Sequence, residues 1–388
     1  MINRQIEQDI NILKNEFPII AILGPRQSGK TTLAKKVFPS YEYVSLEDID
    51  YRDFAINDPR GFLNRYSKNV IFDEIQRVPH LMSYLQTHVD GLPIKGGIVI
   101  TGSHNFFLME QISQSLAGRV GITKLLPFSL QELSEFKLEW KELIFKGAYP
   151  RIYDQGIRPE VFYKNYIETY IEKDIRQIKH ISKLDLFMKF IRILAGRTGQ
   201  ELNTNAIGDE CGVSHNTIKE WISVMEASFL IYKLKPFHKN YNKRIVKNPK
   251  IYFTDTGLVC SLLGIRKKEE IDYHFLKGNL FETFIINEFV KINFNYGEPY
   301  SLYFYRDNHQ KKIDLIVDYG NKQYGVEIKS SETIHEKFFD GLRYWTELTG
   351  NDEGRMYLIY GGSENMTRNK MNVVSWGSIY DRIIRDSL

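Results

Sequence analysis

The segment GPRQSGKTT, from Gly24 to Thr32, is the strongest indication of the fold of the first part of the chain. It matches the pattern G-x-x-x-x-G-K-[ST] and directly follows the apolar run IIAIL, which predicts a buried strand. The segment TTLAKKVF, which begins at the end of the motif, has the spacing of an amphipathic helix. A strand, a glycine-containing turn and a helix in this order predict a phosphate-binding loop (P-loop) in an α/β domain.

Each residue type in this loop has its own part in binding nucleotide phosphates. Gly24 and Gly29 permit backbone angles that turn amide groups toward phosphate oxygens. Lys30 is expected to neutralise charge on the β- and γ-phosphates, and the Thr31 hydroxyl is expected to bind Mg²⁺. The predicted nucleotide-binding residues of the loop are Gly24, Pro25, Arg26, Gln27, Ser28, Gly29, Lys30, Thr31 and Thr32.

A second motif, NVIFDE, ends an apolar run with two acids, Asp73 and Glu74. In P-loop ATPases the first acid holds Mg²⁺ through water, and the second polarises the attacking water. The pair predicts ATP and Mg²⁺ as ligands and favours hydrolysis over phosphotransfer. The sequence contains no N-K-x-D string, which argues against a GTPase.

Several polar residues near these motifs allow two interpretations. Ser103 and Asn105 follow the apolar run GIVITG, and they either contact the γ-phosphate or the attacking water, or cap a helix. Arg119 in LAGRV is either a finger or sensor for a γ-phosphate, with a catalytic role, or a surface arginine. Arg26, inside the loop, is a further candidate for contact with the nucleotide.

These motifs together resemble a group of bacterial and archaeal AAA+-like ATPases. The strings that carry the resemblance span nearly the whole chain: GPRQSGKTT, NVIFDEIQRVP, ITGS, LAGRVGITKLLPFSLQEL, GAYPR, YIEKDI, YFTDTGL and GNLFE. In that group a helical, winged-helix-like segment and a C-terminal domain of uncharacterised function follow the ATPase. The resemblance implies ATP, Mg²⁺ and a homo-oligomer, and it leaves the biological role open.

Composition sets outer limits on the protein class. The chain has 388 residues, 43% of them hydrophobic and 26% charged, which fits a globular protein of two to three domains. The longest apolar runs fall far short of the roughly 18 residues that cross a bilayer, and the first residues lack a signal-peptide pattern. We therefore expect a cytoplasmic protein without membrane contact. Two cysteines, Cys211 and Cys260, cannot make a disulfide framework or a four-ligand zinc site.

Changes of sequence pattern divide the chain into three predicted units. Residues 1–150 alternate apolar runs with helical segments, which predicts a buried parallel sheet. Residues 151–265 are mostly helical, and residues 266–388 combine a long helix with several strands. The predicted fold class is α/β, with an AAA+-like P-loop sheet, a helical winged-helix segment and a C-terminal domain like a restriction endonuclease.

The middle unit contains a candidate DNA-binding element. Residues 203–227 predict a helix, a glycine-containing turn and a second helix that begins after Ser214. The link from Lys233 to Lys250 carries seven Lys or Arg and no acid, which fits contacts to DNA phosphates. The alternative is a packing element with a solvated basic loop. The candidate DNA contacts are His215, Asn216, Lys219, Phe237, His238 and Tyr241.

The last unit carries the pattern D-x₁₂-E-x-K, formed by Asp314, Glu327 and Lys329, with Glu282 on an earlier helix. This set resembles the PD-(D/E)xK nuclease core, with Ile313 in place of the usual proline. The resemblance implies that the three acids bind Mg²⁺ and that Lys329 acts on water and on phosphate charge. The alternative is a fold retained for binding or assembly, in which the acids form salt bridges.

Three hypotheses for function follow. The leading one is a Mg²⁺-dependent ATP hydrolase that uses Lys30, Thr31, Asp73 and Glu74 and couples turnover to DNA binding or processing. The second is an ATP-dependent switch or scaffold that recruits partners and has an inactive nuclease-like fold. The third is a nuclease that cuts without ATP and is only controlled by the ATPase half.

Overall fold

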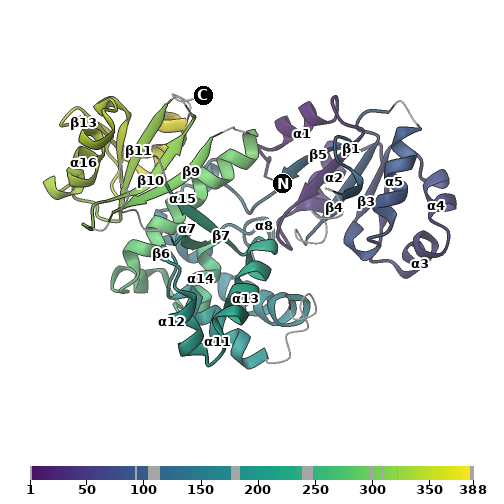
Figure 1. Cartoon of the computed structure of the whole chain (residues 1–388), viewed down its shortest axis with the longest axis horizontal. Helices are drawn as coiled ribbons and strands as arrows, with labels where there is room; N and C mark the ends of the chain where they lie inside the picture. The colour runs from purple at the N-terminus through teal and green to yellow at the C-terminus, as the bar shows by residue number, and fades with distance from the viewer. Residues whose placement is uncertain are drawn as a thin grey trace.

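The computed structural model describes residues 2–91, 94–103, 114–175, 184–237, 248–297, 300–307, 309–320 and 322–384. Figure 1 shows an N-terminal sheet with its helices on one side of the molecule and a C-terminal sheet on the other. A group of helices from the middle of the chain lies below them, and the long helix α15 (Lys277–Tyr296) crosses the centre. In the described residues no helix has the length and apolar character needed to cross a membrane.

The N-terminal sheet consists of five parallel strands in the order β2-β3-β4-β1-β5. Its strands are β1 (Ile19–Leu23), β2 (Glu42–Ser45), β3 (Val70–Asp73), β4 (Ile98–Gly102) and β5 (Val120–Lys124). The apolar runs IIAIL, NVIFDE and GIVITG all belong to this sheet as β1, β3 and β4, which confirms a parallel α/β arrangement. β5 is not predicted by a continuous apolar run, because its residues alternate between buried and half-buried positions.

Helices cover both faces of this sheet. Ile20 and Ile22 of β1 pack with residues of α1 and α2, whereas Ile19 and Leu23 face a cluster that includes α4 and α5. This alternation follows from the two-residue period of a strand, and it buries β1 completely. The helices of this region are α1 (Glu7–Leu13), α2 (Lys30–Val37), α3 (Ile49–Asn57), α4 (Pro59–Arg65) and α5 (Leu81–Asp90).

The middle of the chain is mainly helical. Its helices are α7 (Trp140–Lys146), α8 (Pro150–Asp154), α9 (Pro159–Tyr166), α11 (Leu184–Ala195), α12 (Thr204–Cys211), α13 (His215–Ala227) and α14 (Thr256–Leu262). A π-helical segment, Ile167–Ile175, continues α9. Three short strands accompany the helices: β6 (Gln200–Glu201), β7 (Ile231–Pro236) and β8 (Lys250–Phe253). β8 pairs antiparallel with both β6 and β7.

The motifs GAYPR and YFTDTGL meet at the buried carboxylate of Asp255. This side chain accepts hydrogen bonds from the backbone N–H of Ala148, at 2.7 Å, and from the Tyr163 hydroxyl, at 2.7 Å. It also caps the first turn of α14 by accepting from the N–H of Leu258. These two motifs therefore have a structural role, because Asp255 joins α7, α9 and α14 at one point.

The C-terminal strands continue the middle sheet. One nine-stranded sheet has the order β13-β14-β12-β11-β10-β9-β7-β8-β6, in which β7 pairs parallel with β9. The added elements are β9 (Ser301–Arg306), β10 (Lys312–Asp318), β11 (Gln323–Lys329), α16 (Asp340–Thr349), β12 (Met356–Tyr360), β13 (Met366–Arg368) and β14 (Met371–Ser375). One hydrophobic core runs through both regions. The two later units predicted from the sequence are thus joined by a sheet and a core, although their sequence patterns differ.

Candidate functional site

The candidate nucleotide site lies at the carboxyl edge of the N-terminal sheet. β1 ends at the P-loop, β3 ends at Asp73, and β4, which lies between them, leads to Ser103. A Cβ atom on Gly24 would approach the Leu125 carbonyl oxygen to 2.1 Å, so only glycine fits there. Gly29 has a φ of 94°, a conformation that also favours glycine. The two glycines of the motif therefore shape the loop, as the sequence predicts.

Lys30 begins helix α2 and is almost completely buried. Its ammonium group donates to the carbonyl oxygens of Gly24, at 3.0 Å, and Pro25, at 2.9 Å. Burial lowers the pKa of Lys30 to about 8, although the nearby carboxylates of Glu74 and Asp73 oppose the shift. An anionic phosphate in the loop would replace the two neutral acceptors and favour the charged form of this lysine.

Asp73 accepts hydrogen bonds from three hydroxyl groups of the site. Its carboxylate accepts hydrogen bonds from the hydroxyls of Thr31, at 3.0 Å and 3.1 Å to its two oxygens, and of Tyr43, at 2.7 Å. The Thr101 hydroxyl also donates to it. Asp73 is 6% exposed, so these bonds hold its position tightly. The motif threonine and the first acid of NVIFDE are thus brought into contact, as expected for a shared Mg²⁺ site.

Glu74 follows Asp73 in a left-handed backbone conformation, with a φ of 55°. Its carboxylate accepts from the Ser103 hydroxyl at 3.2 Å and from the Gln76 side-chain amide. The Glu74 backbone N–H donates to Thr101 at 3.3 Å. The structure therefore joins Ser103 to Glu74, while Asn105 lies outside the described residues.

The predicted arginines lie at different places. Arg26 is in the P-loop, and its guanidinium carbon lies 5.7 Å from the centroid of the Tyr170 ring. Arg119 precedes β5 at the opposite edge of the sheet, where it forms an ion pair with Asp90 at 2.6 Å. Arg119 lies beside the start of β1, and the P-loop follows the end of the same strand, five residues further along. The length of this strand keeps Arg119 away from the nucleotide site of its own chain.

The other predicted loop residues line the turn itself. Pro25 supplies a carbonyl to Lys30, and Ser28 is fully buried. The described residues give the Ser28 hydroxyl no hydrogen-bond partner, and the same holds for the Gln27 side-chain oxygen. Thr32 is exposed on the first turn of α2. Buried polar atoms without partners in a phosphate-binding loop fit the binding of a polar ligand.

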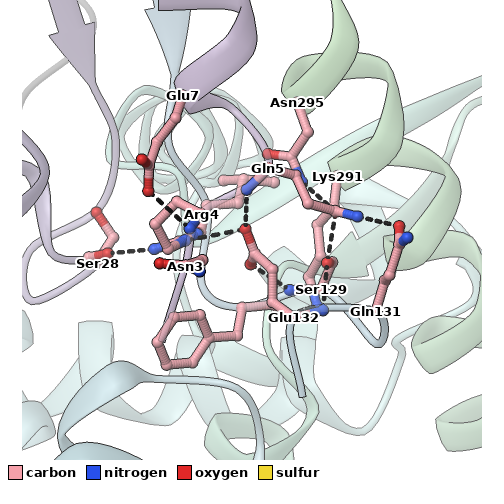
Figure 2. A network of polar contacts seen from close by, with 12 residues as sticks. Asn3, Arg4, Gln5, Glu7, Ser28, Ser129, Gln131, Glu132, Lys291 and Asn295 are labelled. Atoms are coloured by element: carbon pink, nitrogen blue, oxygen red, sulfur yellow. Dashed lines mark hydrogen bonds and ion pairs between the residues drawn. The ribbon is translucent and has the colours of Figure 1, made fainter. Parts of the chain in front are cut away.

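A further residue of this site has no motif to reveal it. The buried Arg4, which precedes α1, donates through its guanidinium to the Ser28 carbonyl of the P-loop at 3.0 Å. It also forms an ion pair with Glu132, at 3.0 Å. Figure 2 shows these contacts in a network that reaches Lys291 and Asn295 of α15. A lone arginine near a chain end gives no sequence signal, because only the tertiary fold brings it to the loop.

The C-terminal candidate site is a cluster of carboxylates and lysines on β10 and β11. Lys329 donates to Glu327 at 2.6 Å and to Asp314 at 3.1 Å. Lys312 adds an ion pair to Asp314 at 3.0 Å. The D-x₁₂-E-x-K residues therefore converge at one point, and both acids are buried. Asp314 and Lys329 line a cleft of about 580 Å³ together with Glu282, Lys250 and Arg306.

The pKa values in this cluster move in opposite directions. Burial would raise the pKa of Asp314, but Lys329, Lys312 and Lys250 hold it well below its usual range. Burial, followed by the charge of Asp314, raises the pKa of Glu327 to about 8. Burial opposes the charged form of Lys329, yet Asp314 and Glu327 raise its pKa above the usual value. One carboxylate of the pair thus stays charged and the other retains a proton near neutral pH.

Glu282 of α15 has different hydrogen-bond partners from those of Asp314 and Glu327. It accepts from the Lys250 ammonium group at 2.7 Å and from the Tyr252 hydroxyl at 2.6 Å, both on β8. Among the described residues, no three His, Cys, Asp or Glu side chains form a group that could hold a metal ion. The acids predicted as Mg²⁺ ligands are therefore paired with lysines in this structure and do not form a ready metal cluster.

The candidate DNA contacts are only partly within the described residues. His215, Asn216 and Lys219 are exposed on α13, which Ser214 caps by accepting from the Thr217 backbone N–H at 3.1 Å. Phe237 is buried against Tyr303 and Trp345, so it is a core residue and does not contact DNA. His238, Tyr241 and most of the basic link lie outside the described residues. Cys211 and Cys260 are buried.

Comparison with protein families finds a match for the region that contains the P-loop. Residues 16–134 match the model of an AAA domain. Residues 137–269 and 277–379 match two models described as domains of unknown function, DUF8612 and DUF4143. The chain therefore carries an AAA-type ATPase domain, and the match supports ATP binding.

Similar proteins occur in bacteria and archaea. An uncharacterized protein of Mycobacterium tuberculosis is 27% identical over 321 residues, which cover 81% of this chain and 71% of that protein. An uncharacterized protein of Methanocaldococcus jannaschii is 26% identical over 364 residues, covering 83% of this chain and 76% of that protein. These relatives extend across the ATPase domain and the regions that follow it.

Similarity to solved structures is weaker. A Walker-type ATPase of Pyrococcus abyssi covers 66% of this chain and 94% of its own, with 13% identity and a TM-score of 0.45. AMPPCP-bound DnaA from Aquifex aeolicus covers 57% of this chain and 85% of its own, with 16% identity and a TM-score of 0.26. Likenesses at this level carry no argument about the function of the chain.

Proposed function

We propose that the chain is a Mg²⁺-dependent ATP hydrolase whose reaction centre consists of Lys30, Thr31, Asp73 and Glu74. The contact between Thr31 and Asp73, beside the buried Lys30, is the observation that carries this proposal. It joins a Mg²⁺-binding type of hydroxyl, a carboxylate and a cation at the end of a phosphate-binding loop. The Ser28 hydroxyl, which finds no hydrogen-bond partner in the described part of the chain, also supports a phosphate ligand, as do the neutral acceptors of Lys30.

Each residue of this centre has a task in the reaction. Mg²⁺, bound by Thr31 and through water by Asp73, would supply charge stabilisation at the phosphate oxygens. Lys30 would exchange its two loop carbonyls for phosphate oxygens and stabilise the developing negative charge. Glu74 would orient the attacking water and accept its proton, with Ser103 and Gln76 holding the carboxylate in place.

The Glu74→Gln variant tests the hydrolysis proposal. We expect ATP turnover with Mg²⁺ to fall by about 100-fold or more, because the amide cannot accept the proton of the attacking water. Binding of ATP should stay close to that of the wild type. Turnover is measured by phosphate release, and binding by titration with a fluorescent ATP analogue. Wild-type chain that binds ATP without turnover, or a variant that retains full turnover, would overturn the proposal.

DNA is the partner that we propose for the middle region. α11, α12 and α13 with the antiparallel strands β6, β7 and β8 support a winged-helix arrangement, and His215, Asn216 and Lys219 are exposed on α13. The test is ATP turnover with and without duplex DNA. Turnover that rises with DNA, and no longer rises in a variant with alanine at these three positions, would support DNA coupling. Turnover indifferent to DNA would favour a protein partner.

A second candidate function is Mg²⁺-dependent cleavage of DNA at the C-terminal cluster. Convergence of Asp314, Glu327 and Lys329 supports it, since the three side chains lie within hydrogen-bonding distance. The ion pairs of the acids with lysines favour the alternative, a nuclease-like fold that only binds or recruits partners. Cleavage that Lys329→Ala abolishes would support the nuclease. Cleavage that also persists in Lys30→Ala would show that cutting does not need ATP.

We also propose a homo-oligomer in which Arg119 contacts the nucleotide of a neighbouring copy. Its place at the sheet edge away from its own P-loop, partly exposed, supports a role between chains. Turnover per chain should then rise with protein concentration in the wild type. The Arg119→Ala variant should bind ATP normally and lack this rise, whereas an unchanged concentration dependence in the variant would exclude the role.

A further inference from the structure

Arg4 is a buried cation bonded to three separate parts of the chain. Its guanidinium donates to the Ser28 carbonyl at 3.0 Å, to the Leu126 carbonyl at 2.7 Å and to the Glu132 carboxylate at 3.0 Å. The guanidinium carbon also lies 4.7 Å from the centroid of the Phe128 ring. With its side chain only 7% exposed, Arg4 has little freedom to adopt another arrangement. Figure 2 shows the side chain between the P-loop and the strand-to-helix segment that contains Glu132.

The Glu132 carboxylate holds Arg4 in this position. One of its oxygens accepts from the Arg4 guanidinium and from the Gln5 backbone N–H at 2.8 Å, and the other accepts from the Ser129 N–H at 2.9 Å. The carboxylate is 1% exposed, so the ion pair is shielded from water. A buried pair with all of these hydrogen bonds made fixes side-chain geometry more strongly than a surface pair.

The bond from Arg4 to Ser28 decides how one peptide group of the P-loop is oriented. The described residues contain no cis peptide bond, so the Ser28 carbonyl and the Gly29 N–H point in opposite directions. Arg4 draws the carbonyl to its own side of the loop. The Gly29 N–H therefore points away from Arg4, and P-loops use backbone amides of this kind to bind phosphate oxygens.

This peptide group needs an external partner because the local chain does not fix it. Gly29 has a φ of 94° and no Cβ atom, so rotation of the peptide before it meets little steric resistance. Ser28 is fully buried, and its carbonyl therefore needs a donor from the protein. Arg4 is that donor, and it comes from a segment that the P-loop motif does not include.

We propose that Arg4 is a positioning residue for ATP binding, which orients the Gly29 N–H toward the phosphates before the nucleotide arrives. The inference rests on the proposed function of the P-loop. It adds that the affinity for ATP depends on the hydrogen bond from the Arg4 guanidinium to the Ser28 carbonyl, with Glu132 holding Arg4 in place. We call this bond the tether. The effect belongs to the loop backbone, so it applies to ADP as well as to ATP.

The Arg4→Lys variant tests this inference, because lysine keeps the charge and lacks the guanidinium fork that reaches three acceptors. We expect the dissociation constants of ATP and ADP with Mg²⁺ to rise by about tenfold, the usual effect of one lost charged or phosphate hydrogen bond. The turnover rate at saturating ATP should stay within about twofold of the wild type. Glu132→Gln, which keeps the shape of the anchor and removes its charge, should give a smaller effect in the same direction.

Lys291→Met is the matched control. Lys291 is also a buried cation, 6% exposed, and it donates to the Phe128 carbonyl at 2.7 Å and pairs with Glu288 without contacting the P-loop. If this control weakens nucleotide binding as much as Arg4→Lys does, the effect is general destabilisation and the inference is wrong. A lower thermal midpoint in both variants, with weaker binding only in Arg4→Lys, supports it.

Hydrogen exchange separates this inference from the proposed function. In the nucleotide-free chain, backbone amides of the P-loop peptide should exchange several-fold faster in Arg4→Lys than in the wild type or Lys291→Met. Faster exchange in Arg4→Lys, combined with a wild type that does not hydrolyse ATP, would support the tether and remove the hydrolase proposal. Unchanged exchange and unchanged ATP affinity in Arg4→Lys would overturn the tether, whatever the wild type hydrolyses.

Discussion

The two candidate sites of this chain hold their carboxylates in opposite ways. Near the P-loop, hydroxyl groups of Thr31, Tyr43 and Thr101 donate to Asp73. In the C-terminal cleft, the ammonium group of Lys329 lies between Asp314 and Glu327. Both arrangements place hydrogen-bond donors on buried acids, but the donors are neutral at the P-loop and positively charged in the C-terminal cluster.

This difference separates a site prepared for an external cation from one that is already neutralised. A hydroxyl orients a carboxylate and leaves its negative charge available, whereas a lysine at salt-bridge distance cancels the charge. Among the described residues, Asp73 has no lysine or arginine at salt-bridge distance, which fits the Mg²⁺ site that we propose there. In the C-terminal cleft, a metal ion has to compete with Lys329 and, at Glu282, with Lys250.

The largest effect is expected at the P-loop lysine. Lys30→Ala should weaken ATP binding by about 100-fold, because it removes a charged donor to phosphate from a buried site. Lys35→Ala is the matched control, since Lys35 is exposed on the same helix and its ammonium group lies over the Tyr43 ring. Titration with a fluorescent ATP analogue measures both. Equal weakening in the two variants would mean that the buried position of Lys30 has no special role.

The protonated acid of the C-terminal cluster predicts an effect of pH on stability. The pKa of Glu327 is raised from 4.5 to about 8 in the folded chain, so the fold retains a proton that the unfolded chain has lost. The free energy of unfolding should therefore fall as pH rises from about 5 to 8. The lowered pKa of Asp314 acts below about pH 4, outside this window.

Glu327→Gln should remove this dependence. At about pH 9 the variant should gain about 2 kcal/mol in free energy of unfolding relative to the wild type, compared with their difference at about pH 6.5. Urea unfolding in the presence of a chelator measures the change. A Glu-to-Gln substitution at Glu220, which is exposed on α13, is the control and should leave the pH profile unchanged. Parallel profiles for wild type and Glu327→Gln would contradict the assignment.

The smallest expected effect tests whether a lysine closes the cleft to metal. Lys250→Met removes the ammonium group that lies 2.7 Å from Glu282 and leaves a buried acid without its cation. The affinity for Mn²⁺ should rise by about tenfold, and Mn²⁺ should raise the thermal midpoint more than in the wild type. Tyr252→Phe keeps the ion pair and should respond to Mn²⁺ like the wild type. A variant no more responsive than Tyr252→Phe would show that Lys250 does not exclude the metal.

Local patterns in the sequence predict much of the N-terminal region. Three predicted strands end at the same edge of the sheet. They are the strand before the P-loop, the strand that ends at Asp73 and the strand formed by GIVITG. This succeeds because buried parallel strands have unbroken apolar sequences, and because carboxyl ends of parallel strands meet at the same edge. The D-x₁₂-E-x-K residues also converge as their spacing indicates.

Long-range partners are the part that sequence patterns miss. Phe237 has the sequence context of a basic, DNA-facing link, yet it packs in the core because β7 joins the C-terminal sheet. Lys250 belongs to the same basic run, yet it neutralises Glu282. Neither contact has a local signal, since the partners are separated by tens of residues and meet only through strand pairing.

Local sequence is enough to predict the phosphate-binding loop, the acids that follow β3 and the order of the elements around them. These features depend on contacts between near neighbours in the chain and on the periodicity of single strands and helices. Which charges are neutralised and which peptide groups are held in place depends instead on how distant segments pack in the folded chain. Arg4 reaches Ser28, and Lys250 reaches Glu282, because a buried charge requires a partner and the fold supplies it from a distant segment.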